Sequence, residues 1–231
     1  MLKQKSQGNL IIISGTTCAG KGTVIQELLK RNSNLSLSVS YTSREMREGE
    51  TNGVEYFFVS QEEFERKIKN GEMLEYEIVH YGKYYGTPKK EVKEMLAQGK
   101  DVILEIDVKG AQNIKKMFPE TILIFILAPS MEEVKRRIKA RGKENNEQII
   151  KRFQVAYQEI NEIPKYNYVV VNDNLELAVQ KIEAILMSEK CRVDRIEEIA
   201  VENQEEIIHE FLMDKTFDNS PLYDKLDEKN M

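Results

Sequence analysis

Nine residues near the start of the chain combine glycines, a lysine and a hydroxyl at the spacing of a phosphate-binding loop. They directly follow the apolar run at residues 10–13, and they are Gly15, Thr16, Thr17, Cys18, Ala19, Gly20, Lys21, Gly22 and Thr23. The pattern is close to G-x-x-x-x-G-K-[ST], with the hydroxyl one residue late. Glycines at both ends let backbone N–H groups turn toward a polyphosphate, and a helix starting near Lys21 adds its positive dipole end. We expect Lys21 to reach the outer phosphates and Thr23 to bind Mg²⁺ directly or through water.

The elements around this loop follow from apolar runs separated by helical patterns. Strands are expected at residues 10–14, 101–107, 121–127 and 168–171. Helices are expected at residues 21–31, 111–118, 130–140, 147–160 and 175–188, with Ser130 and Asn174 as N-caps. Near-continuous apolar strands indicate burial on both faces. The order therefore predicts an α/β fold, a parallel sheet flanked by helices with ligands at the carboxyl ends of its strands.

A change in the sequence pattern over residues 36–98 predicts an inserted small lobe. Short alternating strands are expected at residues 56–59, 74–78 and 83–85, with a charged helix at 61–69. The expected organisation is a phosphate-loop core at residues 1–35 and 99–190 with a lid at about 137–152, the small lobe at 36–98, and an acidic extension at 191–231.

Composition and charge argue against several classes of protein. The chain has 231 residues, 41% of them hydrophobic, without an apolar stretch of membrane-spanning length or a signal-like start, so a soluble, cytoplasmic protein is expected. Cys18 and Cys191 lie too far apart to suggest a disulfide framework or zinc site, so the metal is expected to arrive with the nucleotide. A net charge of −5 and no broad basic surface argue against nucleic-acid binding.

Motifs downstream of the loop resemble those of the guanylate kinases. Residues 38–50 read SVSYTSREMREGE and are followed by Gly53 and by Tyr-Phe-Phe at 56–58, close to the family's S-V-S-x-T-T-R-x-P-R-x-G-E-x-x-G-x-x-Y-x-F. Ser43 and Met46 depart from it without removing a ligand group. Further matches extend the resemblance over about residues 8–188: GEMLE at 71–75, YYGT at 84–87, LEIDVKGA at 104–111, Arg137, Arg141-Gly142, Lys151-Arg152 and Val171-Asn172-Asp173.

The resemblance implies a P-loop nucleoside monophosphate kinase of purine nucleotide metabolism. Such an enzyme transfers the γ-phosphoryl group of ATP to GMP or dGMP in the presence of Mg²⁺. The resemblance places the GMP phosphate on Arg44, Arg47, Tyr56 and Tyr85. Guanidinium forks and phenolic hydroxyls suit a phosphate dianion, whereas an isolated Arg-x-x-Arg would indicate a solvated charge run.

The guanine base is expected on side chains that complement its N1–H, N2–H and O6 groups. By the resemblance, Glu75 accepts from the N–H donors, Ser40 serves O6, Thr87 adds a hydroxyl, and Glu105 touches the guanine edge. A buried carboxylate facing adenine loses its partners at roughly 1–3 kcal/mol per group, so strong discrimination is expected.

The remaining assignments concern the ATP side. Asp107 is expected to orient Mg²⁺ or its waters, with capping of the following helix as the alternative. Asn172 is expected to contact adenine. Arg137, Arg141 and Arg152 match the arginines of a mobile lid, unless they form an exposed helix face. The catalytic set implied by the resemblance is Lys21, Arg44, Asp107, Arg137, Arg141 and Arg152.

Cys18 and the C-terminal extension depart from the resemblance. The family prefers G-P-S-G where residues 15–18 read GTTC, so a positive φ at Cys18 would cost on the order of 1 kcal/mol. A thiol beside a helix N-terminus and Lys21 is also expected to be sensitive to oxidation.

The extension is acidic and carries an apolar pattern. Residues 191–231 hold twelve acidic and five basic residues. An amphipathic helix is expected, docked on its own molecule, on a second subunit of a homo-oligomer or on another partner, and built on Ile196, Ile199, Ile207, Ile208, Phe211 and Leu212.

Two rival functions remain open from the sequence. One is a catalytically inactive guanylate-kinase-like module that binds phosphopeptides, against which Lys21, Arg44 and Arg137 argue. The other is a related sugar-phosphate kinase, against which Ser40 and Glu75 argue.

Overall fold

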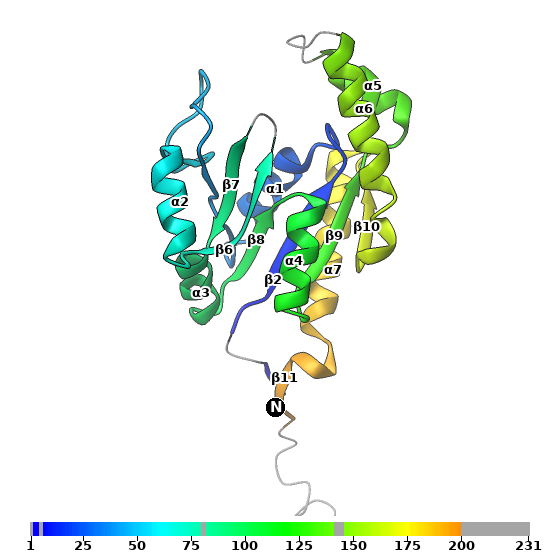
Figure 1. Ribbon diagram of the computed structural model, residues 1–231. Coiled ribbons are helices and arrows are strands. Elements are labelled where there is room, and N and C mark those ends of the chain that lie inside the picture. The colour runs from blue at the N-terminus through cyan, green and yellow to red at the C-terminus, as the bar shows by residue number, and fades with distance from the viewer. Residues whose placement is uncertain (1, 5–6, 80–81, 141–145, 200–231) are drawn as a thin grey trace, which may run out of the picture. The chain divides into compact units, whose positions relative to one another are not determined.

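The structure is a computed structural model that describes residues 2–4, 7–79, 82–140 and 146–199 (Figure 1). The chain divides into two compact units, residues 6–188 and a small unit formed by residues 1–5 with 189–231. No helix among the described residues is both long and apolar enough to cross a membrane.

A five-stranded parallel sheet forms the centre of the larger unit. Its strands run in the order β10-β9-β2-β8-β3. They are β2 (Leu10–Gly15), β3 (Leu35–Leu37), β8 (Asp101–Glu105), β9 (Ile122–Leu127) and β10 (Tyr168–Val171). Since all pairs are parallel, the carboxyl ends of the strands meet at one edge, where β2 runs into the phosphate loop. The predicted parallel α/β fold is confirmed.

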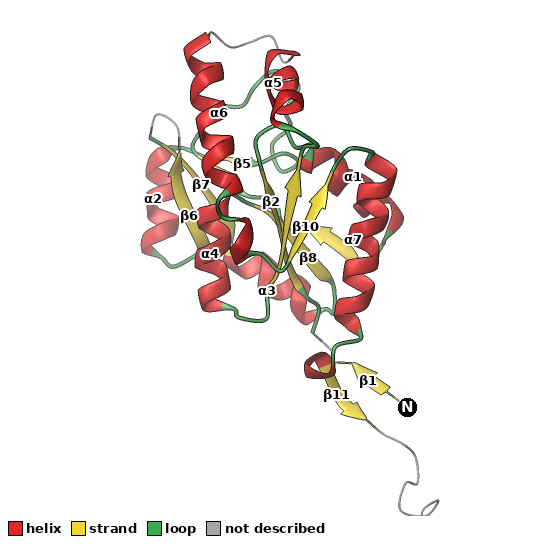
Figure 2. Cartoon of the chain, turned by 90° about the vertical axis from the view of Figure 1, so that its right-hand side faces the viewer, coloured by secondary structure: helices red, strands yellow, loops and turns green. Residues whose placement is uncertain are grey.

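Helices cover both faces of this sheet because its strands present apolar side chains in both directions (Figure 2). On β2, Ile11 and Ile13 pack with α1 (Lys21–Arg31) and α7 (Leu175–Lys190). Leu10 and Ile12 pack on the opposite side with α3 (Lys89–Ala97) and α4 (Val108–Met117). Each fully buried Ile contributes about 1.5–3 kcal/mol, so these alternating faces fix the register of β2.

The smaller sheet is mixed and has the order β5-β4-β7-β6. Its strands are β4 (Tyr41–Thr42), β5 (Phe57–Phe58), β6 (Met73–Val79) and β7 (Lys83–Pro88). Helix α2 (Gln61–Lys69) covers one face, where buried Phe64 lies 5.2 Å from the ring of Tyr84. Because side chains alternate along a strand, Tyr85 and Thr87 belong to the other face, and Glu75 is paired opposite Thr87.

Two further helices, α5 (Met131–Ala140) and α6 (Asn146–Ile160), pack on each other near the carboxyl ends of the large sheet (Figure 1). Ser130 Oγ accepts from Glu133 N at 3.1 Å, as expected of an N-cap. Their shared cluster includes Val134, Ile138, Ala156 and the side chain of Cys18. A 3₁₀ turn, η1 (Ile163–Lys165), leads from α6 toward β10.

Several predicted elements differ from the observed ones. The strand expected at 101–107 ends at Glu105, because Asp107 Oδ1 accepts from Gly110 N at 2.8 Å and caps α4, which begins at Val108 and not at 111. Neither β3 nor α3 was predicted. Both lie at the ends of the stretch expected to form the small lobe, yet β3 belongs to the large sheet and α3 covers it. The division into core, lid and lobe stays a prediction.

The small unit contains an antiparallel pair formed by β1 (Leu2–Gln4) and β11 (Ile196–Ile199), preceded by the turn η2 (Val193–Arg195). Glu189 is 2% exposed, and its Oε2 lies 3.0 Å from Arg195 Nη2. The predicted amphipathic helix is wrong at Ile196 and Ile199, which lie in a strand because β1 supplies a partner from the other end of the chain. The remaining residues of that prediction, at 207–212, lie outside the described residues.

Candidate active site

The phosphate loop joins β2 to α1 through residues in left-handed conformation. Cys18 has φ 60° and Gly20 has φ 88°. The N-terminus of α1 has no capping side chain and no acidic residue in its first turn. Its backbone N–H groups and its positive dipole end are therefore available to an anion.

Asn172 holds the backbone of this loop at Ala19. Its Nδ2 donates to Ala19 O at 2.8 Å, and the residue is only 8% exposed. A Cβ at Gly20 would lie 2.6 Å from that nitrogen, so Gly20 is required both by its φ and by this close approach. The side chain of Asn172, predicted to contact adenine, thus binds the loop itself.

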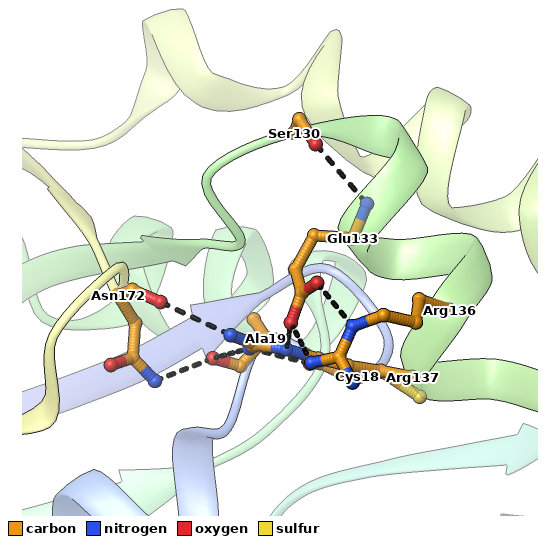
Figure 3. A network of polar contacts seen from close by, with 7 residues as sticks. All are labelled: Cys18, Ala19, Ser130, Glu133, Arg136, Arg137 and Asn172. Carbon is orange, nitrogen blue, oxygen red and sulfur yellow. Dashed lines mark hydrogen bonds and ion pairs between the residues drawn. The ribbon is translucent and has the colours of Figure 1, made fainter. Parts of the chain in front are cut away.

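Arg137 reaches the same loop from α5 (Figure 3). Its Nη1 donates to Cys18 O at 3.2 Å and to Ala19 O at 3.4 Å, and its Nη2 donates to Asn172 O at 3.4 Å. Glu133 Oε1 accepts from Arg137 Nε at 2.6 Å, and the guanidiniums of Arg136 and Arg137 hold the pKa of Glu133 down at about 2. Of the other predicted lid arginines, Arg152 lies on α6, and Arg141 lies outside the described residues.

Lys21 lies at the start of α1 with its ammonium group turned back onto the loop. Its Nζ donates to Gly15 O at 2.8 Å and to Thr16 O at 3.3 Å. Glu159, at the end of α6, accepts from Thr17 N at 3.2 Å. Burial raises the pKa of Glu159, and the nearby Lys21 charge opposes that rise. The sequence did not single out Glu159, because a carboxylate that binds a backbone N–H leaves no signature in residue spacing.

On the small sheet, three of the predicted phosphate ligands lie together. Arg44 makes a two-pronged pair with Glu50, both distances being 2.8 Å, and its guanidinium carbon lies 5.4 Å from the ring centre of Tyr56. The rings of Tyr56 and Tyr85 are 5.7 Å apart. The hydrogen-bonded Glu50 carboxylate raises the pKa of Arg44, and Tyr85 adds a smaller contribution. Arg44 also holds the pKa of Glu50 at about 2, so Glu50 stays ionised and orients the guanidinium.

The structure places the other two predicted ligands of this region, Arg47 and Ser40, through backbone contacts. Arg47 N donates to Glu50 Oε2 at 2.7 Å while the Arg47 side chain is exposed. Ser40 is half-buried immediately before β4, and its carbonyl accepts from Phe57 N at 2.9 Å.

Glu75, which is half-buried, and the buried Thr87 form a polar pair across β6 and β7. Thr87 Oγ1 donates to Glu75 Oε1 at 2.7 Å, and Thr87 is fully buried. Desolvation raises the pKa of Glu75 to about 7 against the Thr87 hydrogen bond, and the charge of Asp107 adds to the rise. A carboxylate held in this way can accept from paired N–H donors of a ligand.

Two acidic residues, Glu105 at the end of β8 and Asp107 just after it, lie between the phosphate loop and the small sheet. Glu105 Oε2 lies 3.9 Å from the position that a Cβ on Gly22 would occupy. Desolvation raises the pKa of Glu105, and the nearby Lys21 charge opposes that rise. Asp107 instead lies by Gly110 and Glu75. Thr23 is exposed in the first turn of α1. Within the described residues, no three His, Cys, Asp or Glu side chains converge as a metal site. Hydroxyl and carboxylate oxygens are nevertheless the ligands that suit Mg²⁺ brought in by a nucleotide.

The expectations for Cys18 concern its backbone and its thiol. Cys18 does adopt a positive φ, and its thiol is 8% exposed and packs with Val134, Ile138 and Ala156 of the helices α5 and α6. Burial among apolar side chains argues against the expected sensitivity to oxidation, which stays a prediction.

Comparison with known proteins identifies the family. The family model for guanylate kinase matches residues 7–189. The chain belongs to the guanylate kinase family. It is 57% identical over 208 residues to the guanylate kinase of Clostridium tetani, covering 90% of this chain and 99% of the relative. It is 52% identical over 204 residues to the guanylate kinase of Caldanaerobacter subterraneus subsp. tengcongensis, covering 88% and 98%.

A solved structure agrees with this assignment. The crystal structure of guanylate kinase from Anaplasma phagocytophilum superimposes with a TM-score of 0.70 at 32% identity, covering 90% of this chain and 96% of that one. As a guanylate kinase family member, the chain is a nucleotide-binding kinase. Most of the small unit lies beyond the family match, because residues 190–231 follow its end.

Proposed function

We propose that this chain transfers the γ-phosphoryl group of ATP to GMP or dGMP, forming ADP and GDP or dGDP. The observation that carries the proposal is the face of the small sheet that presents Arg44, Tyr56 and Tyr85 together with the Glu75–Thr87 pair. A phosphate dianion fits the first group, and the N1–H and N2–H donors of guanine fit the second.

On the donor side, the loop at residues 15–23 surrounds the phosphates of ATP with backbone N–H groups. When ATP binds, Lys21 and Arg137 leave their backbone carbonyl partners and bind phosphate oxygens instead. Phosphate oxygens are the stronger acceptors, because they carry a negative charge and a carbonyl oxygen carries only a partial one. Bound Mg²⁺ would neutralise charge on the β- and γ-phosphates, and Thr23 with Glu105 supplies oxygen ligands for it or for its waters.

The positions of the two acidic residues favour an exchange of the roles expected from sequence. Glu105 lies beside Gly22 and Lys21, and so we assign it to the ATP and Mg²⁺ side. Asp107 lies beside Glu75, where it can accept from the guanine edge in addition to capping α4.

The reaction needs no covalent intermediate on the enzyme. A phosphate oxygen of GMP attacks the γ-phosphorus in line, the bond to the β–γ bridging oxygen breaks, and that oxygen leaves with ADP. Arg44 and the tyrosines hold the attacking phosphate, while Lys21 and Arg137 stabilise charge on the transferred group. The lid function of Arg141 and Arg152, the cytoplasmic location and a homo-oligomeric state stay predictions.

An ADP-release assay with GMP, dGMP, AMP, UMP and ribose phosphates tests the activity. We expect turnover with GMP and dGMP only, because AMP offers N1 as an acceptor to the Glu75 carboxylate. Absence of GMP-dependent turnover together with tight phosphopeptide binding would support the inactive module, and turnover of ribose phosphates would support the sugar-phosphate kinase.

Variants separate the two halves of the site. Lys21→Ala should lower kcat by about a hundredfold or more, whereas Lys30→Ala on the exposed side of the same helix should not. Glu75→Gln should raise the KM for GMP and leave the KM for ATP unchanged. Equal effects on both substrates would contradict the guanine assignment.

A further inference from the structure

We infer that Gly110 is a specificity-determining residue of the acceptor site, because its missing side chain sets how closely α4 approaches the Glu75 carboxylate. The inference rests on the proposed function of Glu75 as the guanine-binding acid. Gly110 is buried in the first turn of α4. A Cβ there would lie 3.0 Å from Glu75 Oε2, 3.5 Å from Glu75 Cδ and 3.4 Å from Asp107 Oδ1.

The backbone at Gly110 gives no reason for glycine. The residue is helical without a positive φ, and glycine in a helix costs about 1 kcal/mol relative to alanine. Helix propensity alone therefore favours alanine at this position. The contact that an added methyl group would make with Glu75 is the feature that glycine avoids.

Glu75 is not free to retreat from such a methyl group. Its Oε1 is bound by Thr87 at 2.7 Å, and the pairing of β6 with β7 fixes Glu75 opposite Thr87. Thr87 is fully buried, so it cannot follow the carboxylate outward. A side chain at 110 therefore requires the carboxylate to move by a few tenths of an ångström, which strains its hydrogen bond with Thr87 or turns its plane.

Such a displacement should weaken binding of the guanine base without changing the position of the transferred phosphate. Gly110 N also donates to Asp107 Oδ1 at 2.8 Å, and a Cβ at Gly110 would lie near both carboxylates of the guanine side. Guanine presents its N1–H and N2–H at a fixed separation, and a misplaced acceptor satisfies only one of them. The three atoms nearest to a Cβ at this position belong to Glu75 and Asp107, and none belongs to the phosphate loop.

Gly110→Ala tests the inference by steady-state kinetics and thermal unfolding. We expect the KM for GMP to rise about tenfold, the equivalent of one weakened hydrogen bond, with kcat and the KM for ATP within about twofold. The melting temperature should change little, because the gain of about 1 kcal/mol from alanine in the helix offsets the weakened Glu75–Thr87 contact. Lys116→Ala, an exposed position of the same helix, is the matched control and should change none of these constants.

A double-mutant cycle with Glu75→Ala shows whether the effect passes through the carboxylate. In the Glu75→Ala background, Gly110→Ala should raise the KM for GMP no further. An unchanged KM for GMP in the single variant, or the same rise in both backgrounds, would overturn the inference while leaving the kinase activity in place. A wild-type chain without GMP turnover would instead contradict the proposed function.

The stability of the variants provides a second, independent test. If Gly110→Ala alone is unstable, the double variant should fold, because removal of the Glu75 side chain makes room for the methyl group. Instability of both variants would overturn the inference, since the clash would then lie elsewhere.

Discussion

Glu75 carries a carboxyl group whose desolvation has consequences for both ligand binding and folding. Burial raises its pKa to about 7 from the ordinary value of 4.5. Guanine needs the ionised form as acceptor, whereas burial favours the neutral form. Near neutral pH the free enzyme therefore contains both forms.

The first prediction concerns the pH dependence of GMP use. As pH falls through about 7, protonation of Glu75 should remove the acceptor, and kcat/KM for GMP should fall by about tenfold per pH unit below it. The profile of Glu75→Gln, measured with the same GMP stock, corrects for titration of the GMP phosphate itself. Identical profiles for wild type and Glu75→Gln would contradict the assignment.

The second prediction concerns stability. The folded-state pKa of Glu75 lies above the unfolded value, so its ionisation lowers the stability of the fold progressively as pH rises from about 4.5 to about 7. The full loss then persists at higher pH. Glu75→Gln should therefore raise the melting temperature by a few degrees at pH 8 and change it little at pH 4. Glu91→Gln, on the surface of α3, is the matched control and should show no such difference between the two pH values.

At the scale of elements, α5 places a carboxylate and a guanidinium one turn apart. Glu133 binds Arg137 Nε, which orients the rest of the guanidinium toward Cys18, Ala19 and Asn172 (Figure 3). Because an i,i+4 pair on a helix costs little to form, the helix positions the cation before any nucleotide arrives.

The third prediction tests this arrangement. Glu133→Gln should lower kcat by about tenfold, because Arg137 then samples other rotamers, and it should leave the KM for GMP unchanged. Glu132→Gln changes the neighbouring acid of the same helical turn and should have no effect. Equal behaviour of the two variants would show that Arg137 needs no such partner.

The success of sequence-based prediction varied with the kind of element. Long apolar runs such as β2 and β9 were predicted, since burial on both faces leaves a continuous signal. The short strand β3 and the charged helix α3, with only Val92 and Leu96 buried, gave no such signal and were missed. Strand β11 was taken for part of a helix, because its partner β1 is supplied by the opposite end of the chain.

Prediction of the site residues also depended on whether the sequence itself carries a signal for them. Residues expected to bind ligands through charged side chains, such as Arg44 and Glu75, could be located from motifs. Glu133 and Glu159 could not, because they act on Arg137 and on a backbone N–H, which only the folded arrangement brings near them.

For the whole molecule, every described residue of the site lies within the larger unit, residues 6–188. The fourth prediction follows from that division. A chain ending at residue 190 should keep kcat and both KM values within about twofold. It should also lose thermal stability, because the ion pairs of the buried Glu189 with Arg192 and Arg195 are removed together with the segment.

Glu189→Gln in the shortened chain serves as its control. Removal of the charge should recover part of the lost melting temperature without changing turnover. A shortened chain that loses turnover while remaining folded would contradict the assignment of the whole site to the larger unit.

The central position of β2 has a consequence for biosynthesis. Leu10 pairs with Val102, and Ile11 pairs with Ile122, so the strand that supports the phosphate loop finds both neighbours about 90 to 110 residues later. At a translation rate of roughly 5–20 residues per second, β2 waits on the order of ten seconds for them. During that interval the nascent chain exposes an apolar strand with two open edges, which is a template for aggregation. A nucleotide cannot protect this stage, because its binding loop forms only when β8 and β9 have left the ribosome.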